Sequence, residues 1–149
     1  MSTITATNLH GDTIRKTGGS LGVDIRIKNT SVYESDGGTS VTQNLVQGVC
    51  KSWVNFDGSE SPLTNRDSFN VSSLYDNGTG NYDQVFTNNM SSANYSVTGT
   101  VADNIPISSN RDTTFQCVAE STSQINLNLF SNSQNDRNHV CGQAFGDLA

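Results

Sequence analysis

Apolar and polar residues alternate over short stretches in the last two-thirds of the chain. The clearest stretch is 124–130, where Ile125, Leu127 and Leu129 alternate with glutamine and asparagine. A repeat of two places successive side chains on opposite faces of a β-strand, so each stretch indicates a strand with one buried face. The pattern predicts seven strands, at residues 52–56, 67–75, 82–87, 95–101, 113–119, 124–130 and 139–145.

Turn-forming residues separate these stretches. The dipeptide Asp57-Gly58 ends the first, and the segment 76–80 (Asp-Asn-Gly-Thr-Gly) separates the second from the third. Asn-Gly is the strongest short hairpin signal, and both Pro62 and Pro106 fall between predicted strands, where proline interrupts no ladder. Seven short strands at this spacing predict an all-β fold, an antiparallel β-sandwich-like module over residues 49–149.

Residues 1–48 have a different pattern, and we expect them to form an N-terminal arm and attachment segment. Residues 1–20 are polar and contain several glycines, which is typical of an extended arm. Residues 21–28 alternate strictly between apolar and polar, which predicts a half-buried strand. The Asp-Gly-Gly triplet at 36–38 predicts a turn or linker, and the apolar spacing at 41–49 predicts a short helix or collar.

The chain is poor in apolar residues for its 149 residues. Hydrophobic residues make up 33% of it and charged residues 15%, and asparagine, serine, threonine and glycine fill the difference. Such a chain buries a large core with difficulty, and its regular strand patterns favour burial against copies of itself over disorder. We expect contacts between copies at the valine-rich segment and the tryptophan strand, at Val41, Leu45, Val49 and Trp53.

The charge of the chain argues against one class of partner. The formal net charge is -6, and the surplus of acidic residues lies wholly after residue 48. Nucleic-acid binding requires a basic face, so we expect no nucleic-acid partner. No stretch is apolar enough to span a membrane, and no apolar leader follows the N-terminus, so we expect a chain made in a cytoplasm without membrane insertion.

Three cysteines and two histidines offer few ligands for a metal. An odd number of cysteines does not suggest a disulfide framework, so we expect Cys50, Cys117 and Cys141 to be small buried apolar residues. His139 and Cys141 share a strand face, but a zinc site would need two further ligands, and Cys117 is the only obvious one. We therefore expect no metal and no cofactor.

Carboxylates in turns raise the questions of glycan hydrolysis and of calcium binding. Nothing singles out a catalytic pair, because the candidates all lie in or near turns: Asp76, Asp83, Asp103 and Asp136. A calcium site could draw oxygen ligands from 76–83, but turn chemistry explains these residues better: Asp76, Asn77, Asn81 and Asp83. The sequence therefore favours a protein that is not an enzyme.

Loops and aromatic residues are the remaining candidates for recognition. Loops rich in serine and asparagine resemble adaptable binding surfaces, with solvated loops as the plainer alternative, and the candidate residues are Ser91, Asn94, Asn110, Asn132 and Asn135. Four aromatic side chains could stack on sugar rings, but their strand positions favour the core: Trp53, Phe56, Phe69 and Tyr75.

Residues 50–97 contain an ordered series of segments, which are Lys51-Ser52-Trp53-Val54-Asn55-Phe56-Asp57-Gly58, Arg66 to Ser73, Asp76 to Tyr82, Phe86 to Met90 and Ala93 to Tyr95. This series resembles the tail-fibre-like and appendage proteins of marine bacteriophages, especially those that infect cyanobacteria, and it covers about a third of the chain. Cys50 and Ser52 depart from that pattern, since alanine is common at both positions. The resemblance implies a trimeric virion component without catalytic residues.

Together with the strand pattern and the composition, this resemblance implies a structural bacteriophage protein, assembled into the virion in the host cytoplasm. We expect a homotrimeric tail fibre or tail appendage that attaches to other tail or capsid proteins by its N-terminal segment. Its C-terminal module would be exposed, with host surface glycan as a further partner. The alternative is a capsid decoration or head-fibre protein that binds the shell and recognises no receptor, and an enzyme that degrades surface polysaccharide is the least favoured class.

Overall fold

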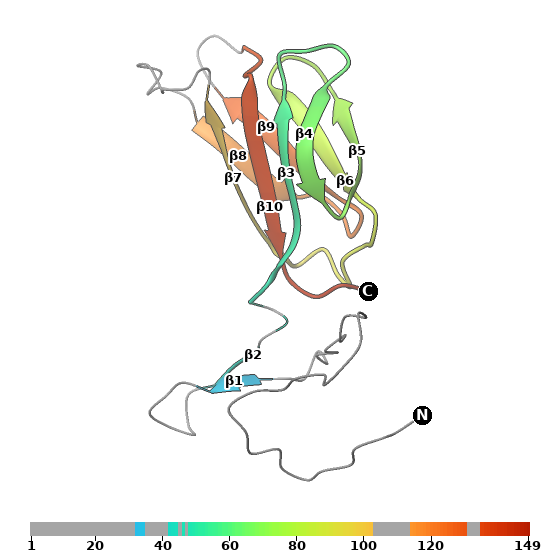
Figure 1. The fold of residues 1–149 in the computed structure, drawn as a ribbon, viewed down its shortest axis with the longest axis vertical. Coiled ribbons are helices and arrows are strands. Elements are labelled where there is room, and N and C mark those ends of the chain that lie inside the picture. Colours follow the sequence, from blue (N-terminus) through green and yellow to red (C-terminus); the bar gives the residue numbers. More distant parts are fainter. Residues whose placement is uncertain (1–31, 35–41, 45, 47, 103–113, 131–134) are drawn as a thin grey trace, which may run out of the picture.

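The chain folds as an all-β protein (Figure 1). The structure is a computed structural model that describes residues 32–34, 42–44, 46, 48–102, 114–130 and 135–149. Within these ranges the strands are β1 (Val32–Glu34), β2 (Thr42–Asn44), β3 (Cys50–Asp57), β4 (Thr64–Phe69), β5 (Val71–Asp76), β6 (Asn81–Phe86), β7 (Ser96–Ala102), β8 (Thr114–Ala119), β9 (Gln124–Phe130) and β10 (His139–Phe145). None of the described residues belongs to a helix long and apolar enough to cross a membrane.

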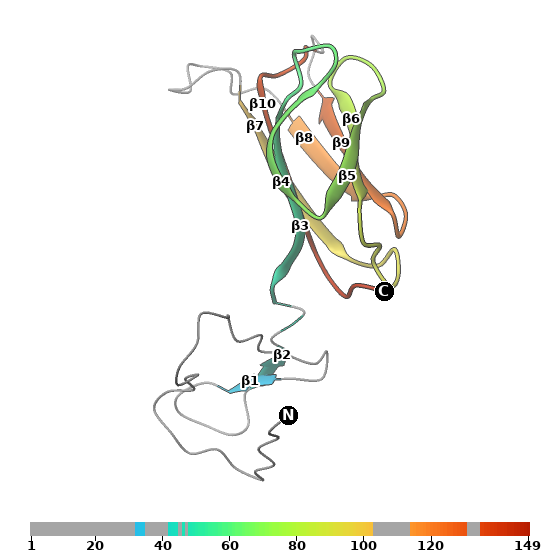
Figure 2. The ribbon, with the colours of Figure 1, turned by 45° about the vertical axis from the view of Figure 1, so that its right-hand side comes forward.

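Strands β3 to β10 form two four-stranded sheets that pack together as a β-sandwich (Figure 2). Sheet I has the order β4-β3-β10-β7 and sheet II the order β5-β6-β9-β8, and neighbouring strands in both are antiparallel. The all-β, sandwich-like fold predicted from the alternating pattern is therefore confirmed. β1 and β2 pair with each other in a separate two-stranded sheet.

The first and last strands of the sandwich are neighbours at the centre of sheet I. β10 lies between β3 and β7, and its ladder with β3 pairs Val140 with Phe56 and Phe145 with Cys50. A central ladder between strands from opposite ends of the module requires long-range pairing, which local hairpins cannot supply. The sandwich therefore depends on the whole module and not on any contiguous half of it.

The end of the sandwich at which β3 begins, called here the proximal end, also holds the last residues of the chain (Figure 1). The loop between β6 and β7 is tied to this tail, because Ser91 N donates to the carbonyl of Asp147 at 2.8 Å and Ala149 N donates to the carbonyl of Asn89 at 2.9 Å. An isolated bridge between Met90 and Leu148 adds to this connection. The chain thus enters and leaves the sandwich at the same end.

The opposite end, called the distal end, carries the loops that follow β3, β5 and β9. Gly58 N donates to the carbonyl of Arg137 at 2.9 Å, and Leu129 N donates to the carbonyl of Gly80 at 2.7 Å. The first bond joins the loop after β3 to the loop between β9 and β10, and the second lies within sheet II, between β9 and the start of β6. The bond between Gly58 and Arg137 therefore connects the two layers at the distal end.

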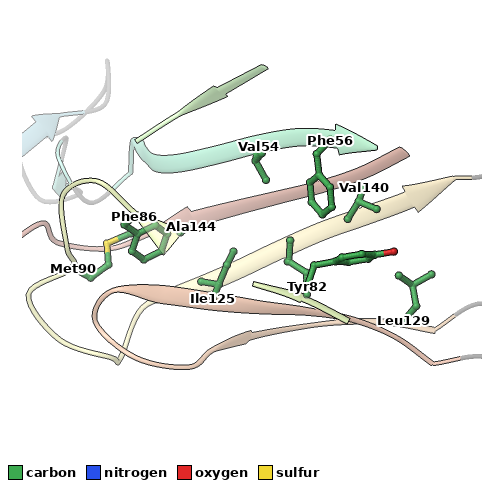
Figure 3. Close-up of a cluster of buried hydrophobic side chains, with 10 residues drawn as sticks. Val54, Phe56, Tyr82, Phe86, Met90, Ile125, Leu129, Val140 and Ala144 are labelled. Carbon is green, nitrogen blue, oxygen red and sulfur yellow. The ribbon is translucent and has the colours of Figure 1, made fainter. Parts of the chain in front are cut away.

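The core lies between the two sheets, where their buried side chains meet (Figure 3). It consists of Val54, Phe56, Tyr82, Phe86, Met90, Ile125, Leu127, Leu129, Val140 and Ala144. The rings of Phe56 and Tyr82 pack edge to face with centroids 5.2 Å apart. Burying a large apolar side chain contributes about 1.5–3 kcal/mol. Ile125, Leu127 and Leu129 are all buried, as the alternation in 124–130 predicts.

The stretch predicted as one strand at 67–75 is two strands, so that prediction is wrong. β4 belongs to sheet I and β5 to sheet II, and the chain crosses between the sheets at Asn70, whose φ is 56°. Asparagine tolerates this left-handed conformation because its short side chain can hydrogen-bond locally. The alternation of apolar and polar residues continues through the crossing, which is why the sequence pattern does not reveal it.

Of the short helix or collar predicted at 41–49, the helix is wrong within the described residues, because Thr42–Asn44 form strand β2. A helix of nine residues cannot recover its nucleation cost without tertiary packing. Further along, Val49 N donates to the carbonyl of Val46 at 3.2 Å, and Lys51 Nζ donates to the carbonyls of Val46 and Val49. These bonds form a turn that leads directly into β3.

The predicted core positions of the aromatic residues are correct for Phe56 and wrong for Phe69 and Tyr75. Phe56 is fully buried, whereas Phe69 and Tyr75 are 54% and 56% exposed. In β3, residues 52, 54 and 56 point inward, so Trp53 lies on the outer face of sheet I and is half-buried. Phe69 is its direct partner on β4, and the two aromatic residues lie side by side outside the core.

The turn predicted at 76–80 is confirmed and joins β5 to β6. Gly78 and Gly80 have φ values of 120° and 71°, and Asp76 Oδ1 accepts a hydrogen bond from Gly78 N at 2.9 Å. Pro62 lies in the loop between β3 and β4, as predicted. The predicted arm at 1–20, the strand at 21–28, the turn at 36–38 and the loop position of Pro106 lie outside the residues that the structure describes.

Candidate binding surfaces

The loop residues singled out for binding do not come together. Ser91 and Asn94 lie in the loop between β6 and β7 at the proximal end, whereas Asn135 lies between β9 and β10 at the distal end. Asn110 and Asn132 fall outside the described residues. The structure therefore divides these residues between opposite ends of the sandwich, and it does not unite the described ones in a single site.

The proximal loop borders a shallow hollow of about 310 Å³, lined by Ser91, Ser92, Asn94, Tyr95, Ser96, Phe145, Gly146 and Asp147. Its wall is fixed by Tyr95, whose hydroxyl lies 2.8 and 2.7 Å from the carbonyl oxygens of Ser121 and Gln124 and shares its single proton between them. Burial raises the pKa of Tyr95 to about 12, with a smaller contribution from the charge of Glu120. The hollow is polar and open, and it lies against the tail of the chain.

The distal end contains a buried polar contact between the two sheets. The hydroxyl of Tyr82 bonds to the carbonyl of Gly58 at 3.1 Å and to Asp136 Oδ1 at 2.8 Å, and Gly80 N donates to the same Asp136 oxygen at 2.7 Å. Burial and the neighbouring Asp136 carboxylate raise the pKa of Tyr82. Asp136 therefore orders loops, as its position near a turn suggests.

On the outer face of sheet I, the aromatic pair lies beside a charged cluster. Arg66 forms a 2.6 Å salt bridge with Asp57 and lies 3.3 Å from His139 Nδ1. Burial alone would raise the pKa of Asp57, but hydrogen bonds from Ser59 and the charge of Arg66 hold it below its usual value. These contacts join β3, β4 and β10. Asp57, Arg66 and His139 thus each have a partner within the cluster.

The cysteines and histidine considered for zinc do not converge. Cys141 lies on the outer face of sheet I, because its neighbours Val140 and Ala144 point inward, whereas Cys117 packs against the core from sheet II. Burial raises the pKa of Cys117 to about 11. All three cysteines are free thiols, and the described residues hold no group of three or more His, Cys, Asp or Glu side chains that could bind a metal.

The outer face of sheet II carries a set of polar side chains that the sequence reading did not identify. We call it the amide face and define it by Asn81 and Asp83 on β6 and Gln124, Asn126 and Asn128 on β9. Asn126 Nδ2 donates to Asn81 Oδ1 at 2.7 Å and to Asp83 Oδ1 at 2.8 Å. Two of the four residues considered as calcium ligands, Asn81 and Asp83, thus accept hydrogen bonds from the Asn126 amide, and Asp76 Oδ1 accepts one from Gly78 N in the turn.

Exposed apolar side chains border this amide face. Tyr75 on β5 and Val118 on β8 are registered with Asp83 and Asn126, so one row runs across all four strands of sheet II. The signal in the sequence was the polar half of each alternating strand, but which polar residues become neighbours depends on strand pairing. For this reason the sequence predicts that Asn81 and Asp83 lie in or near a turn, but not that they are neighbours of Asn126.

The fold and these surfaces define the module as an antiparallel β-sandwich. Comparison with known proteins adds no relative, because no protein-family model, no curated protein and no solved structure matches the chain. The similarity of residues 50–97 to phage appendage proteins therefore stays a prediction that rests on those residues.

Proposed function

We propose that this chain is a structural, non-enzymatic component of a bacteriophage particle, a tail appendage that attaches through residues 1–48 and holds its sandwich away from the attachment point. The observation that carries this proposal is that β3, the first strand of the sandwich, begins at the proximal end. Any attachment segment that precedes β3 joins the sandwich there, at the end opposite the distal loops (Figure 1). The segments of residues 50–97 that resemble phage appendage proteins supply the class of particle.

Self-association as a trimer is part of the proposal. Trp53 and Phe69 form an aromatic pair on the outer face of sheet I, and Val49, just before β3, is more than half exposed. Large apolar side chains that stay exposed in a single chain, as those of Phe69 and Val49 do, are typical of residues that become buried in an interface. We assign this face to contacts between copies, with Val49 and Trp53 as two of its residues. Val41 and Leu45, which were expected beside them, lie outside the described residues.

The test of attachment is a deletion of residues 1–40. We expect the shortened chain to keep the circular-dichroism spectrum and cooperative unfolding of the full chain, because the sandwich begins at Cys50. We also expect it to be missing from purified particles when it replaces the full chain during assembly. Full-length protein expressed in the same way serves as the control, and incorporation is measured by immunoblot of gradient-purified particles.

Incorporation of the shortened chain at the level of the full chain would refute the attachment role of the N-terminal segment. Gold-labelled antibodies against the sandwich then locate the protein on the particle. Label on the tail supports the appendage, whereas label spread over the shell supports the alternative of a capsid decoration or head-fibre protein. Absence of the full chain from every particle fraction would refute the virion assignment altogether.

A further inference from the structure

The amide face is held in one arrangement by hydrogen bonds among its own side chains. Asn126 Nδ2 bridges Asn81 and Asp83, and Gln124 Nε2 donates to Glu120 Oε2 at 2.8 Å and to Asp83 Oδ2 at 3.5 Å. Polar groups that are fixed before a ligand arrives lose little conformational entropy on binding. The polar groups of this face are therefore held in fixed orientations before any ligand binds.

The arrangement of polar and apolar groups on this face is the reverse of a protein interface. Protein interfaces have an apolar centre and a polar rim. In the row that crosses the four strands, the half-buried Asp83 and Asn126 lie on the two central strands, while Tyr75 and Val118 on the edge strands are 56% and 53% exposed. Outside this row, the same face of the central strands also carries two apolar residues, Val85 and Phe130. The row from Tyr75 to Val118 crosses four strands and spans about 14 Å. Such a surface fits a ligand that is polar in its middle and apolar along its sides.

The charge of the face limits the ligand further. Asp83 and Glu120 carry negative charge on or beside it, and the described residues of β5, β6, β8 and β9 include no lysine or arginine. An anionic ligand would approach these carboxylates without a compensating cation. The acceptors that the face offers are the carboxylates of Asp83 and Glu120, each of which has lone pairs beyond its bond to Gln124. An uncharged ligand with hydroxyl donors matches these conditions.

We propose that the amide face of sheet II binds an uncharged oligosaccharide. The hydroxyl groups of a sugar both donate and accept hydrogen bonds, as amide and carboxylate groups require, and the C–H faces of its rings pack on exposed aromatic side chains such as that of Tyr75. The biological meaning of this inference rests on the proposed function, since it gives the displayed module a ligand class. Its physical basis lies in sheet II alone.

The first experiment screens the purified full-length protein on an array of uncharged oligosaccharides of glucose, galactose, mannose and N-acetylhexosamines. Matched oligosaccharides that carry uronic or sialic acids are printed beside them. We expect binding to uncharged members and weaker binding to their acidic counterparts. The best soluble, monovalent ligand is then titrated by calorimetry into the wild type and two variants, Tyr75→Ala and Phe69→Ala.

Phe69→Ala is a matched control, because Phe69 is 54% exposed and lies on an edge strand of the opposite sheet. We expect Tyr75→Ala to weaken binding by roughly tenfold and Phe69→Ala to leave it unchanged. Val118→Glu, which adds charge and bulk at the other edge of the row, should weaken binding as well.

Three results would overturn the inference. These are no binding to any uncharged oligosaccharide, tighter binding to the acidic set, or equal effects of Tyr75→Ala and Phe69→Ala. A fall in native mass on Tyr75→Ala would also overturn it, because the face would then be a contact between copies. None of these results bears on whether the chain enters particles, so the proposed function fails or stands separately.

Discussion

At the scale of single residues, buried polar groups decide how well this small core is defined. The hydroxyl of Tyr82 joins Gly58 from sheet I and Asp136 from the last loop, so one phenol connects three segments. Gln84 is buried as well, and its Nε2 donates to Ser52 Oγ at 2.7 Å across the sandwich while its Oε1 has no partner among the described residues. Buried polar groups stabilise a fold only when they are paired.

We predict that Tyr82→Phe lowers the free energy of unfolding by about 1–2 kcal/mol, because Asp136 and the Gly58 carbonyl lose a buried hydrogen-bond donor while the ring packing is kept. The measurement is equilibrium unfolding in urea. Tyr75→Phe is the control, since Tyr75 is exposed and its variant should stay within about 0.5 kcal/mol of the wild type. Equal stabilities of the two variants would show that the Tyr82 hydroxyl has no structural role.

At the scale of elements, the crossing at Asn70 determines how the two sheets are connected. Asn70 Nδ2 donates to the carbonyls of Lys51 and Asn88, each at 3.0 Å, and its Oδ1 accepts from Asn88 N at 2.7 Å. The residue therefore adopts a left-handed conformation and also bonds to segments of both sheets. This combination lets β4 end in sheet I and β5 begin in sheet II within a single residue.

Two variants of Asn70 separate these contributions. We predict that Asn70→Ala lowers the free energy of unfolding by about 2–4 kcal/mol, through the left-handed conformation and the lost hydrogen bonds. Asn70→Gly should cost about 1–2 kcal/mol less than Asn70→Ala, because glycine adopts a positive φ without strain. Both are measured by urea unfolding. A glycine variant no more stable than the alanine variant would show that backbone conformation does not matter there.

At the scale of the whole molecule, the aromatic pair on the outer face of sheet I and the small core both favour association. We predict a native mass near three times the chain mass of 16.0 kDa by light scattering on a sizing column. The double variant Trp53→Ala/Phe69→Ala should elute as a monomer, whereas Tyr75→Ala on the opposite sheet should keep the native mass. A monomeric wild type would refute the trimer. It would also show that a single sandwich buries its core without contacts from other copies.

The alternating pattern by itself determined that this protein is all-β and where most of its strands lie. Alternation is a local property, because successive side chains of any strand point to opposite faces whatever its partner. Ile125, Leu127 and Leu129 are buried for this reason, and the turn between β5 and β6 formed where Gly78 and Gly80 permit a positive φ.

Only the tertiary structure decided which strands became neighbours, and therefore what lies on each face. The sequence could not show that the chain changes sheet at Asn70, that Phe69 and Tyr75 end outside the core, or that Asn81 and Asp83 meet Asn126. Gly99 and Gly142 are likewise partners in one ladder, where a side chain on either would collide with sheet II. These are relations between residues distant in the chain, and they arise from strand pairing and sheet packing, which no local pattern encodes.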